Sequence, residues 1–281
     1  MGNVISIINM KGGVGKTTLS LGISDYLAET GSKVLLIDID PQFNATQAML
    51  AFYKKSEYES DDYYNDKILN NHRTIYQLFK MQTNLSDESK TPKADDLIIT
   101  LSNNLDLLCG DLNLILVNKS SDHSFVMRLK NFIDDNNLRN KYDYIIIDCP
   151  PTMTIYTDSA LMASDFYLIP NRIDRYSIVG IELLQKVISN LITEERIKLK
   201  CIGLIYTMVK KDSAKQEKLR INFESKKADE IEIFSSYTSM VNNVSLGAQG
   251  PIPTKYKSSK QDIEAIVEEM KNKINIDVSE G

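Results

Sequence analysis

The chain has 281 residues, of which 42% are hydrophobic and 25% are charged, a composition typical of a globular domain that buries a sizeable core. The net charge of −5 excludes a uniform basic coat for nucleic acid. No apolar run reaches the ~18 residues needed to span a bilayer, and no signal peptide is evident. Cys109, Cys149 and Cys201 are scattered without C-x-x-C spacing, which excludes a disulfide framework or zinc site and favours a reducing cytoplasm.

The chain opens with a predicted strand–loop–helix–strand unit. Val4–Ile8 is a β-branched apolar run typical of a buried parallel strand. After a glycine loop, Thr17 to Glu29 carries apolar residues at helical spacing, and Gly31 is a natural cap for the end of that helix. Val34–Ile37 is the next strand, which completes a βαβ unit within ~30 residues.

The middle of the chain contains a predicted insertion. Lys54 to Asp66 is polar, acidic and rich in tyrosine, which predicts a surface insertion over about residues 54–72. Beyond it, the pattern indicates an amphipathic helix at Arg73–Lys80 and a loop at Lys90–Asp96. A strand at Leu105–Leu108, a helix at Phe125–Asp134 and a buried strand at Tyr144–Ile147 follow.

Helices and strands continue to alternate beyond the Pro150–Pro151 break. We expect helices around Ser159–Ala163, over Gly180–Ile192 and over Ala214–Glu224, and an amphipathic terminal helix over Ile263–Ile274. The strands expected between them are Phe166–Ile169 and Cys201–Met208, with a weak strand at Glu232–Phe234. The predicted fold is therefore α/β: one domain over residues 1–281 with a mostly parallel central sheet and helices on both faces.

The glycine loop after the first strand predicts a phosphate site. It reads K-G-G-V-G-K-T-T from Lys11, which departs from the usual G-x-x-x-x-G-K-(S/T) pattern. Its glycines let backbone N–H groups turn toward phosphate oxygens, and the following helix adds its positive N-terminal end. Lys16 is expected to reach the β- and γ-phosphates, and the Thr17 hydroxyl to hold Mg²⁺. A glycine turn with solvated lysines is the alternative, which the strand before and the helix after disfavour.

Two acidic motifs follow apolar strands, at the sheet edge where ligands bind in open α/β folds. Asp148 ends the strand I-I-I-D-C-P-P and is expected to bind Mg²⁺, through water, as a Walker B carboxylate. In the motif I-D-I-D-P-Q, Asp40 or Asp38 is expected to orient or deprotonate the attacking water. Aspartates at strand ends are also common turn formers, and the phosphate loop on the same sheet favours function here.

Together, K-G-G-V-G-K-T-T, D-I-D-P-Q-F-N-A-T and I-I-I-D-C-P-P resemble the ParA/Soj/MinD family of deviant Walker A P-loop ATPases, from residue 3 to about residue 270. The D-P-Q-x-N-A-T stretch and L-D-L-L-C-G-D-L-N-L are similar to the ParA branch, which segregates plasmids and chromosomes. The resemblance implies ATP and Mg²⁺ as cofactors, slow hydrolysis and a homodimer that forms around ATP.

Individual roles follow from the resemblance. Lys11 is implied to be the signature lysine that reaches the partner's ATP across the dimer, Thr18 to contact the α-phosphate, and Asp40 to position the water. The phosphate-binding set is Gly12, Gly13, Val14, Gly15, Lys16, Thr17 and Thr18. A solvated surface lysine is the alternative for Lys11.

The family also implies non-specific DNA binding by the ATP dimer. Arg196 to Lys227 holds ten Lys and Arg against three acids, although the chain as a whole is acidic. Such a run is often only a solvated surface. The candidates for phosphate contacts with DNA are Lys198, Lys200, Lys210, Lys211, Lys215, Lys218, Arg220, Lys226 and Lys227, with a second small group at Lys255, Lys257 and Lys260.

The implied partner is a centromere-binding ParB-type protein that stimulates hydrolysis, and the implied location is the cytoplasm, on the nucleoid. Because the sequence begins at the first strand, we expect no operator-binding domain. A MinD-like ATPase that cycles on membranes is the main alternative, but the helix over Gln261–Lys273 has an acidic polar face, which disfavours it. Iron–sulfur chemistry needs clustered cysteines, which are missing, and a small-molecule ligase or kinase on this fold stays open.

Overall fold

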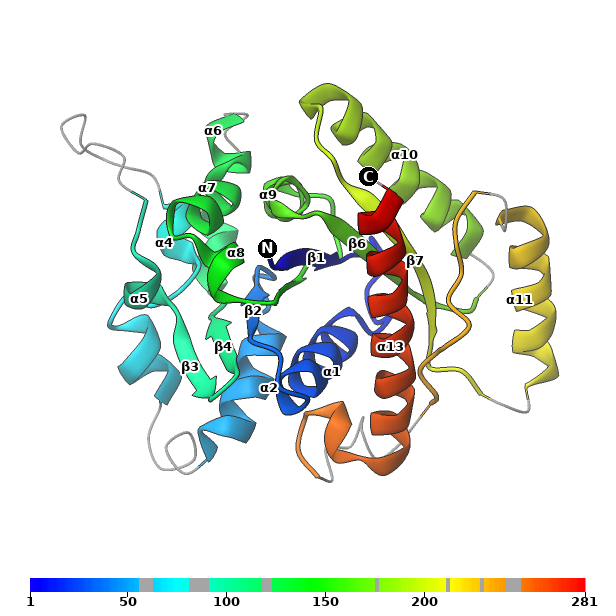
Figure 1. Cartoon of the computed structure of the whole chain (residues 1–281), viewed down its shortest axis with the longest axis horizontal. Coiled ribbons are helices and arrows are strands. Elements are labelled where there is room, and N and C mark those ends of the chain that lie inside the picture. The colour runs from blue at the N-terminus through cyan, green and yellow to red at the C-terminus, as the bar shows by residue number, and fades with distance from the viewer. Residues whose placement is uncertain are drawn as a thin grey trace.

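The computed structural model describes residues 1–55, 63–80, 91–117, 123–174, 177–210, 213–227, 230–240 and 249–280. A seven-stranded sheet in the order β3-β4-β2-β5-β1-β6-β7 runs through it (Figure 1). The strands are β1 Asn3–Ile7, β2 Val34–Asp38, β3 Ile99–Ser102, β4 Leu105–Leu108, β5 Tyr144–Asp148, β6 Phe166–Arg172 and β7 Lys200–Thr207. All neighbours pair in parallel except β3 and β4, so the predicted mostly parallel sheet is confirmed.

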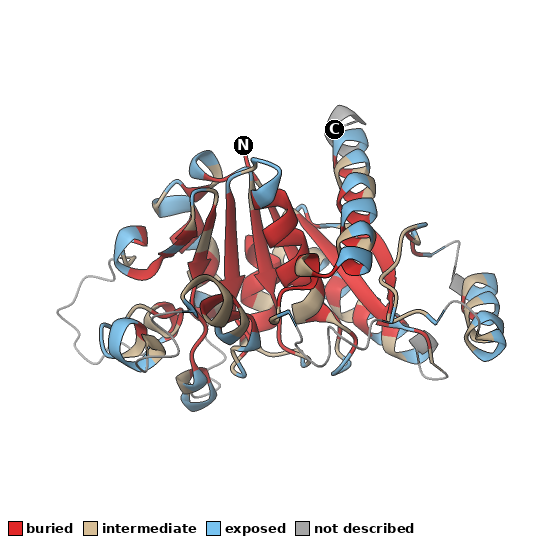
Figure 2. Cartoon of the chain, turned by 90° about the horizontal axis from the view of Figure 1, so that it is seen from below, coloured by how far each residue is buried: buried red, intermediate tan, exposed pale blue. Residues whose placement is uncertain are grey.

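Helices cover both faces of the sheet, as predicted (Figure 1). One face packs against α7 Arg128–Asp135, α9 Ile155–Ala163 and α10 Ser177–Glu195, the other against α1 Lys16–Glu29, α2 Asn44–Tyr53 and α13 Lys257–Glu280. The alternation within a strand divides the core in two: Val4 of β1 packs on the first side, Ile5 and Ile7 on the second. The strands are buried on both faces (Figure 2).

The remaining helix, α11 Ala214–Lys227, follows β7, and shorter elements complete the described chain. They are the helices α4 Tyr76–Phe79, α5 Ala94–Leu97, α6 His123–Val126 and α8 Leu138–Lys141, the 3₁₀ turns η2 Leu112–Leu116 and η3 Pro253–Lys255, and the π-helical turn η1 Tyr64–Leu69. At the far end of the sheet, residues 231–240 run beside β7, where Phe234 N donates to Leu204 O at 2.8 Å and Val209 N to Thr238 O at 2.9 Å. This segment covers the edge of β7.

The predicted terminal helix is confirmed as α13, and its apolar stripe packs into the core. Ile263, Ile266, Val267, Met270 and Ile274 are all buried. The helix packs along α1, which begins at the phosphate loop. An apolar stripe that is already buried has nothing to offer a lipid surface, which argues against the membrane-cycling alternative. Among the described helices, none is long and apolar enough to cross a membrane.

The βαβ unit and its cap are confirmed. Helix α1 begins at Lys16, and Gly31 follows its C-cap with φ of 96°. Ser32 N donates to Leu27 O and Gly31 N to Ala28 O, which is a Schellman motif.

Several expected elements differ. The helix predicted over Arg73–Lys80 begins only at Tyr76, because Thr74 bridges to Cys109 at the sheet edge and Ile75 N donates to Cys109 O. The predicted helix over Phe125–Asp134 divides into α6 and α7 at Met127. The loop expected over Lys90–Asp96 contains the start of α5. The strand expected over Glu232–Phe234 is reduced to a single bridge, between Ile233 and Leu204. Helix α2 and strand β3 were not predicted.

The predicted insertion is described in part. Residues 56–62 lie outside the described part of the chain. The turn η1 folds back onto the domain, and its Ile68 side chain is fully buried in the α1–α2 side of the core. The C-terminal part of the predicted insertion, which includes η1, therefore contributes to the packing of the domain.

Candidate functional site

The phosphate loop lies at the C-terminal ends of β1 and its neighbours. Gly13 and Gly15 have φ of 70° and 86°, a left-handed conformation that favours glycine, and Gly15 is the N-cap of α1. Side chains anchor the loop to two further strands. Thr207 Oγ1, at the end of β7, donates to Val14 O at 2.8 Å, and Asn9 Nδ2 donates to Pro170 O of β6 at 2.8 Å. The loop is thus held in place before any nucleotide binds.

Lys16 carries a buried positive charge beneath this loop. Its side chain donates from Nζ to Asn9 O at 3.1 Å and to Lys11 O at 3.2 Å. The residue is 7% exposed, and burial lowers the pKa of Lys16, partly offset by nearby Asp148. Both hydrogen-bond partners are neutral carbonyls, so the ammonium is ready to pair with an anion. A phosphate group above the loop fits that requirement.

Thr17 and Asp148 form the oxygen-rich side of the site. Thr17 Oγ1 donates to Asp148 Oδ2 at 2.8 Å, and Ser20 Oγ, one turn further along α1, donates to Asp148 Oδ1 at 2.8 Å. A hydroxyl beside a buried carboxylate is the oxygen donor set that Mg²⁺ prefers. The predicted Thr17–Asp148 pair is therefore brought together, and Ser20 is a contact that the motif did not indicate.

Asp38 and Asp40 take different positions at the end of β2. Asp38 is fully buried and accepts from Thr46 N at 2.7 Å and Thr46 Oγ1 at 2.8 Å. Its strand register places it opposite Asp148. Asp40 lies in the following turn, is 8% exposed and accepts from Gln42 N at 2.9 Å. Because Asp38 is held by Thr46 and has no exposure, Asp40 is the better placed of the two to meet a water molecule.

The buried carboxyls are electrostatically coupled. Burial and the nearby charge of Asp148 raise the pKa of Asp38 to about 8. Burial raises the pKa of Asp148 to about 6, although Thr17 and Ser20 oppose the shift. Two acidic groups at adjacent strand ends repel each other when both are ionised, and Mg²⁺ held by Asp148 and Thr17 would reduce that repulsion.

Lys11 lies at the exposed start of the loop. Its Nζ forms an ion pair with Asp174, which follows β6 in the same chain, and the two side chains are 43% and 30% exposed. Lys11 N donates to Asn9 Oδ1 at 3.0 Å, which fixes the backbone beneath the side chain. The Lys11 ammonium therefore has a partner in its own chain, Asp174, and it is exposed enough to exchange that partner for another.

An apolar groove of about 820 Å³ adjoins the Asp40 turn. Its lining includes Asp40, Pro41, Leu114, Met153 and Tyr156. Three further apolar side chains of η2 are exposed by half or more, Leu112, Ile115 and Leu116. Exposed apolar side chains at this density beside a site indicate a surface that contacts another molecule.

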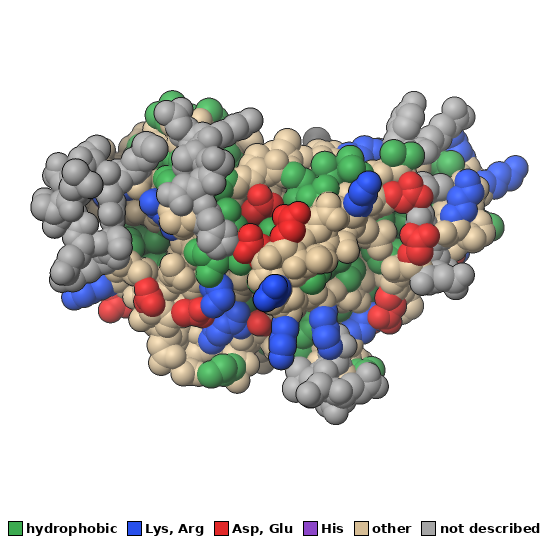
Figure 3. Space-filling view, turned by 90° about the horizontal axis from the view of Figure 1, so that it is seen from above, with side chains coloured by type: hydrophobic (Ala, Val, Ile, Leu, Met, Phe, Trp, Pro, Cys, Tyr) green, Lys and Arg blue, Asp and Glu red, His purple; other side chains and the backbone are tan. Residues whose placement is uncertain are grey.

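The predicted DNA candidates are not gathered in one place. Lys198 and Lys200 lie at the start of β7 and Lys210 lies beyond its end, so the strand separates them. Lys215, Lys218 and Lys226 are exposed on α11, at the outer end of the molecule beyond β7 (Figure 1). Lys and Arg side chains project at that end in the space-filling view, with acidic ones among them (Figure 3). Lys211 and the side chain of Lys227 lie outside the described residues.

Several of the candidate cations are engaged inside the chain. Lys255 Nζ donates to the buried Asp25 at 2.8 Å and to Glu29 at 2.6 Å, and Lys260 also binds Glu29. Arg220 pairs with Glu217 at 2.8 Å. Lys255 thereby stabilises the contact between η3 and α1, and this placement argues against a role in DNA binding. Lys257 is exposed at the start of α13.

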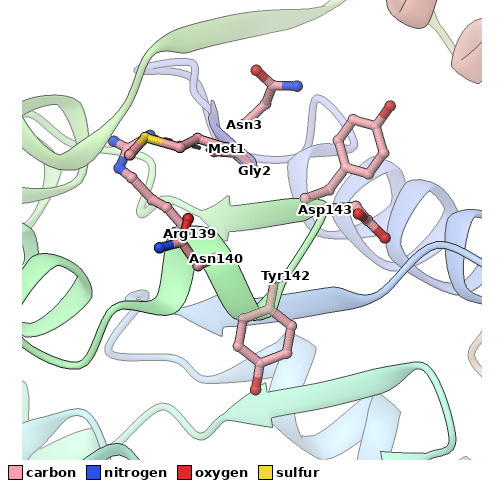
Figure 4. Close-up of a pocket in the computed structure, with 8 residues that line it drawn as sticks. Met1, Gly2, Asn3, Arg139, Asn140, Tyr142 and Asp143 are labelled. Carbon is pink, nitrogen blue, oxygen red and sulfur yellow. Dashed lines mark hydrogen bonds between the residues drawn. The ribbon is translucent and has the colours of Figure 1, made fainter.

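The opposite edge of the sheet also has a hollow, of about 350 Å³, lined by Met1, Asn3, Arg139 and Tyr142 among others (Figure 4). The Arg139 guanidinium in this hollow already has partners within the chain, because it donates to Asp165 at 2.5 Å and to Ala163 O at 3.0 Å. Cys109 and Cys149 are buried and Cys201 is half-buried, and the described residues contain no cluster of metal-ligating side chains.

The fold and the site define a nucleotide-binding P-loop protein, and comparison with known proteins identifies its family. The model of an AAA domain family, AAA_31, matches residues 2–201. An uncharacterised protein of Methanocaldococcus jannaschii, MJECL24, is 36% identical over 214 residues, 75% of this chain and 74% of its own length. The sporulation initiation inhibitor protein Soj of Bacillus subtilis is 31% identical over 209 residues, 74% of each chain.

Solved structures agree. A plasmid partition protein of Borrelia burgdorferi bound to AMPPNP is 25% identical with a TM-score of 0.71, covering 97% of this chain and 99% of its own. Cobyrinic acid a,c-diamide synthase of Mycobacterium smegmatis, bound to an ATP analogue and magnesium, has the same fold, with 20% identity, a TM-score of 0.70 and 94% and 92% coverage.

The chain belongs to this AAA-domain family, within the ParA/Soj/MinD group of P-loop ATPases and close to the ParA type. The predicted resemblance is confirmed. ATP and Mg²⁺, expected from the sequence, agree with the donor set around Lys16 and Asp148 and with the ligands of these structures.

Proposed function

We propose that this protein is a ParA-type ATPase that segregates plasmid or chromosomal DNA through an ATP-dependent dimer. The observation that carries the proposal is the arrangement at one sheet edge. Buried Lys16, the Thr17–Asp148 pair and Asp40 surround the phosphate loop, while Lys11 lies exposed at its start. The exposed position of Lys11 leaves its ammonium accessible to a second subunit.

In the proposed cycle, each part of the site has one task. Lys16 and the loop N–H groups bind the phosphates, and Thr18 contacts the α-phosphate. Thr17 and Asp148 would hold Mg²⁺, which neutralises charge on the β- and γ-phosphate oxygens when it is bound. Asp40 orients the attacking water. Hydrolysis to ADP and phosphate, followed by release of the phosphate, would remove the charge that Lys11 of the partner subunit had paired with, and the dimer would separate.

The dimer interface is proposed to include the apolar groove beside Asp40. Ile115 lines this groove and is exposed, and Leu112 and Leu116 of the same 3₁₀ turn are exposed as well. Two ATP molecules brought face to face repel each other, and a lysine donated from each subunit offsets that repulsion. ATP binding would therefore be a condition for dimerisation, which is how a ligand that prefers one state shifts an equilibrium.

DNA is proposed to bind along α11. Lys215, Lys218 and Lys226 are exposed and share one face of this helix, by their spacing of three and eight residues. Phosphate contacts by lysines need no base sequence, and the dimer doubles them, so dimerisation raises DNA affinity steeply. A centromere-binding ParB-type partner is proposed to stimulate hydrolysis and so to set the time of release at the nucleoid.

Sedimentation velocity with ATP, ADP or no nucleotide tests the switch. The native chain is expected to dimerise only with ATP, Lys16→Ala to remain monomeric in every condition, and Asp40→Ala to accumulate as an ATP-bound dimer that does not decay. A native chain that stays monomeric with ATP under conditions where nucleotide binding is saturated would refute the sandwich dimer.

A further inference from the structure

The turn that carries Asp40 ends on a residue with an unfavourable backbone. Phe43 is the N-cap of α2, and its φ of 40° and ψ of 37° lie in the left-handed region, which bulky side chains rarely occupy. Phe43 N donates to Asp40 O at 2.8 Å, so this conformation closes the turn over Asp40. Such a conformation persists only where the surrounding structure holds it, and it is often found at functional sites.

An aromatic contact from a distant part of the chain holds Phe43. The ring of Tyr64, the first residue of η1, stacks on the Phe43 ring with centroids 5.0 Å apart and planes 15° from parallel. Behind Phe43 there is no free space, because a Cβ built on Gly110 would meet the Phe43 Cβ at 2.6 Å and the Asp38 Cγ at 3.0 Å. The half-buried Phe43 thus lies between the Tyr64 ring and the Gly110 backbone.

A hydrogen-bond chain connects the same tyrosine to the strand end. Tyr64 Oη donates to Gly110 O at 2.8 Å, and Gly110 N donates to Thr46 Oγ1 at 2.8 Å. Thr46 Oγ1 in turn donates to Asp38 Oδ2 at 2.8 Å, and Asp38 Oδ1 accepts from Asp40 N at 3.2 Å. The ring of Tyr64 therefore supports the turn from one end, and its hydroxyl is connected to the other end.

We propose that Tyr64 is a positioning residue for hydrolysis: it holds the Asp40–Phe43 turn in the geometry from which Asp40 orients the water. The inference rests on the proposed role of Asp40. It gives a catalytic task to the part of the predicted insertion that folds back onto the domain, and it places that task on a π-helical turn, an element frequent at functional sites.

The test compares three variants with the native chain. Tyr64→Ala removes both contacts, Tyr64→Phe keeps the ring and removes the hydroxyl, and Phe43→Leu removes the stack from the other side. Tyr142→Phe is the matched control, since its hydroxyl donates to Asp106 at 2.6 Å at the opposite edge of the sheet. Single-turnover ATP hydrolysis, affinity for a fluorescent ATP analogue and melting temperature are measured for each.

We expect Tyr64→Ala to hydrolyse ATP about tenfold more slowly, because a displaced catalytic group loses its alignment. Tyr64→Phe and Phe43→Leu should show smaller losses, and nucleotide affinity should stay within about twofold in all three, because the loop at Lys16 is untouched. Exchange of the Phe43 amide hydrogen should accelerate in Tyr64→Ala. In an Asp40→Ala background, Tyr64→Ala should slow hydrolysis no further, since both act through one group.

A folded Tyr64→Ala protein that hydrolyses ATP at the native rate would overturn the inference while leaving Asp40 in its role. If Tyr64→Ala does not fold, unchanged rates in both Tyr64→Phe and Phe43→Leu would overturn it equally. An Asp40→Ala protein with native hydrolysis would instead refute the proposed role of Asp40, and the positioning role with it.

Discussion

Lys11, which we propose to reach the nucleotide of a partner subunit, forms an ion pair with Asp174 of its own chain. The pair joins the start of the phosphate loop to the end of β6. Lys11 must leave Asp174 before it can cross a dimer interface. In the proposed dimer the ion pair therefore competes with the contact of Lys11 across the interface, and its strength would set part of the free-energy cost of dimerisation.

Removing Asp174 should make the ATP dimer tighter. An exposed ion pair contributes only about 0.2–1 kcal/mol, so Asp174→Ala should lower the dimer dissociation constant by at most about fivefold per protomer. Sedimentation equilibrium with ATP measures the change. Lys130→Ala, which removes a surface ion pair to Asp134, is the matched control and should have no effect. Looser dimers in Asp174→Ala would mean that Asp174 contributes to the interface itself.

Replacing Lys16 should separate stability from function. Its ammonium is buried against two carbonyls, and burial lowers the pKa of Lys16. Lys16→Met keeps the shape of the side chain and removes the charge, so the nucleotide-free protein should gain on the order of 1 kcal/mol and melt roughly 2 °C higher. Thermal melting by circular dichroism tests this.

The same variant should lose nucleotide binding. A calorimetric titration of Lys16→Met with Mg²⁺ and ATP should give no measurable heat, because the charged hydrogen bonds to phosphate are gone. A variant that melts lower than the native chain without nucleotide would contradict the electrostatic account of Lys16.

The sequence motifs predicted the phosphate loop, its helix and Asp148, because each of these depends on residues close together in the chain. Contacts between distant segments carried no such signal. Lys255 had the pattern of a DNA-binding lysine, yet its partners Asp25 and Glu29 lie 230 and 226 residues away. The pairing of Asp38 with Asp148 depends on β2 lying beside β5, which no local pattern specifies.

The tyrosine-rich insertion shows the same limit. Its polarity predicted a surface segment, and the stacking of Tyr64 on Phe43 could not be anticipated because a side chain in a left-handed conformation leaves no mark in the sequence. Helix α2 was missed for a related reason, since it begins directly after that residue instead of after a Ser, Thr, Asp or Asn cap.

Stability of the nucleotide-free protein should fall as pH rises from 6 to 8. The pKa of Asp38 is raised to about 8 and that of Asp148 to about 6, both above the ~3.9 of an unfolded chain. At a pH between the unfolded and the folded pKa of a group, the folded state therefore binds more protons than the unfolded state. The stability gained in this way is lost as each group ionises in the folded protein. Melting temperatures measured at pH 6 and pH 8 test the direction.

Two changes should reduce this pH dependence. Asp148→Asn removes one ionising group and its repulsion of Asp38, and Mg²⁺ with ADP favours the ionised carboxylate of the native chain. Both should bring the melting temperatures at pH 6 and pH 8 closer together. A native chain that is more stable at pH 8 than at pH 6 would contradict the raised pKa values.

The lysine face of α11 should control DNA affinity without affecting hydrolysis. Removing one lysine that binds a DNA phosphate lowers the salt dependence of binding, so Lys215→Ala and Lys218→Ala should each reduce the slope of log affinity against log salt by about 1. Lys198→Ala is the control, because Lys198 is exposed beside the start of β7, away from α11. Equal effects of Lys198→Ala and Lys215→Ala would place the DNA surface elsewhere.

The most direct test of the DNA-partitioning switch is binding to random-sequence duplex DNA, by co-pelleting or gel shift, with ADP or ATP. The native chain is expected to bind DNA only with ATP, Lys16→Ala not to bind, and Asp40→Ala to bind and remain bound. Absence of DNA binding in every nucleotide state, despite ATP-driven dimerisation, would contradict it.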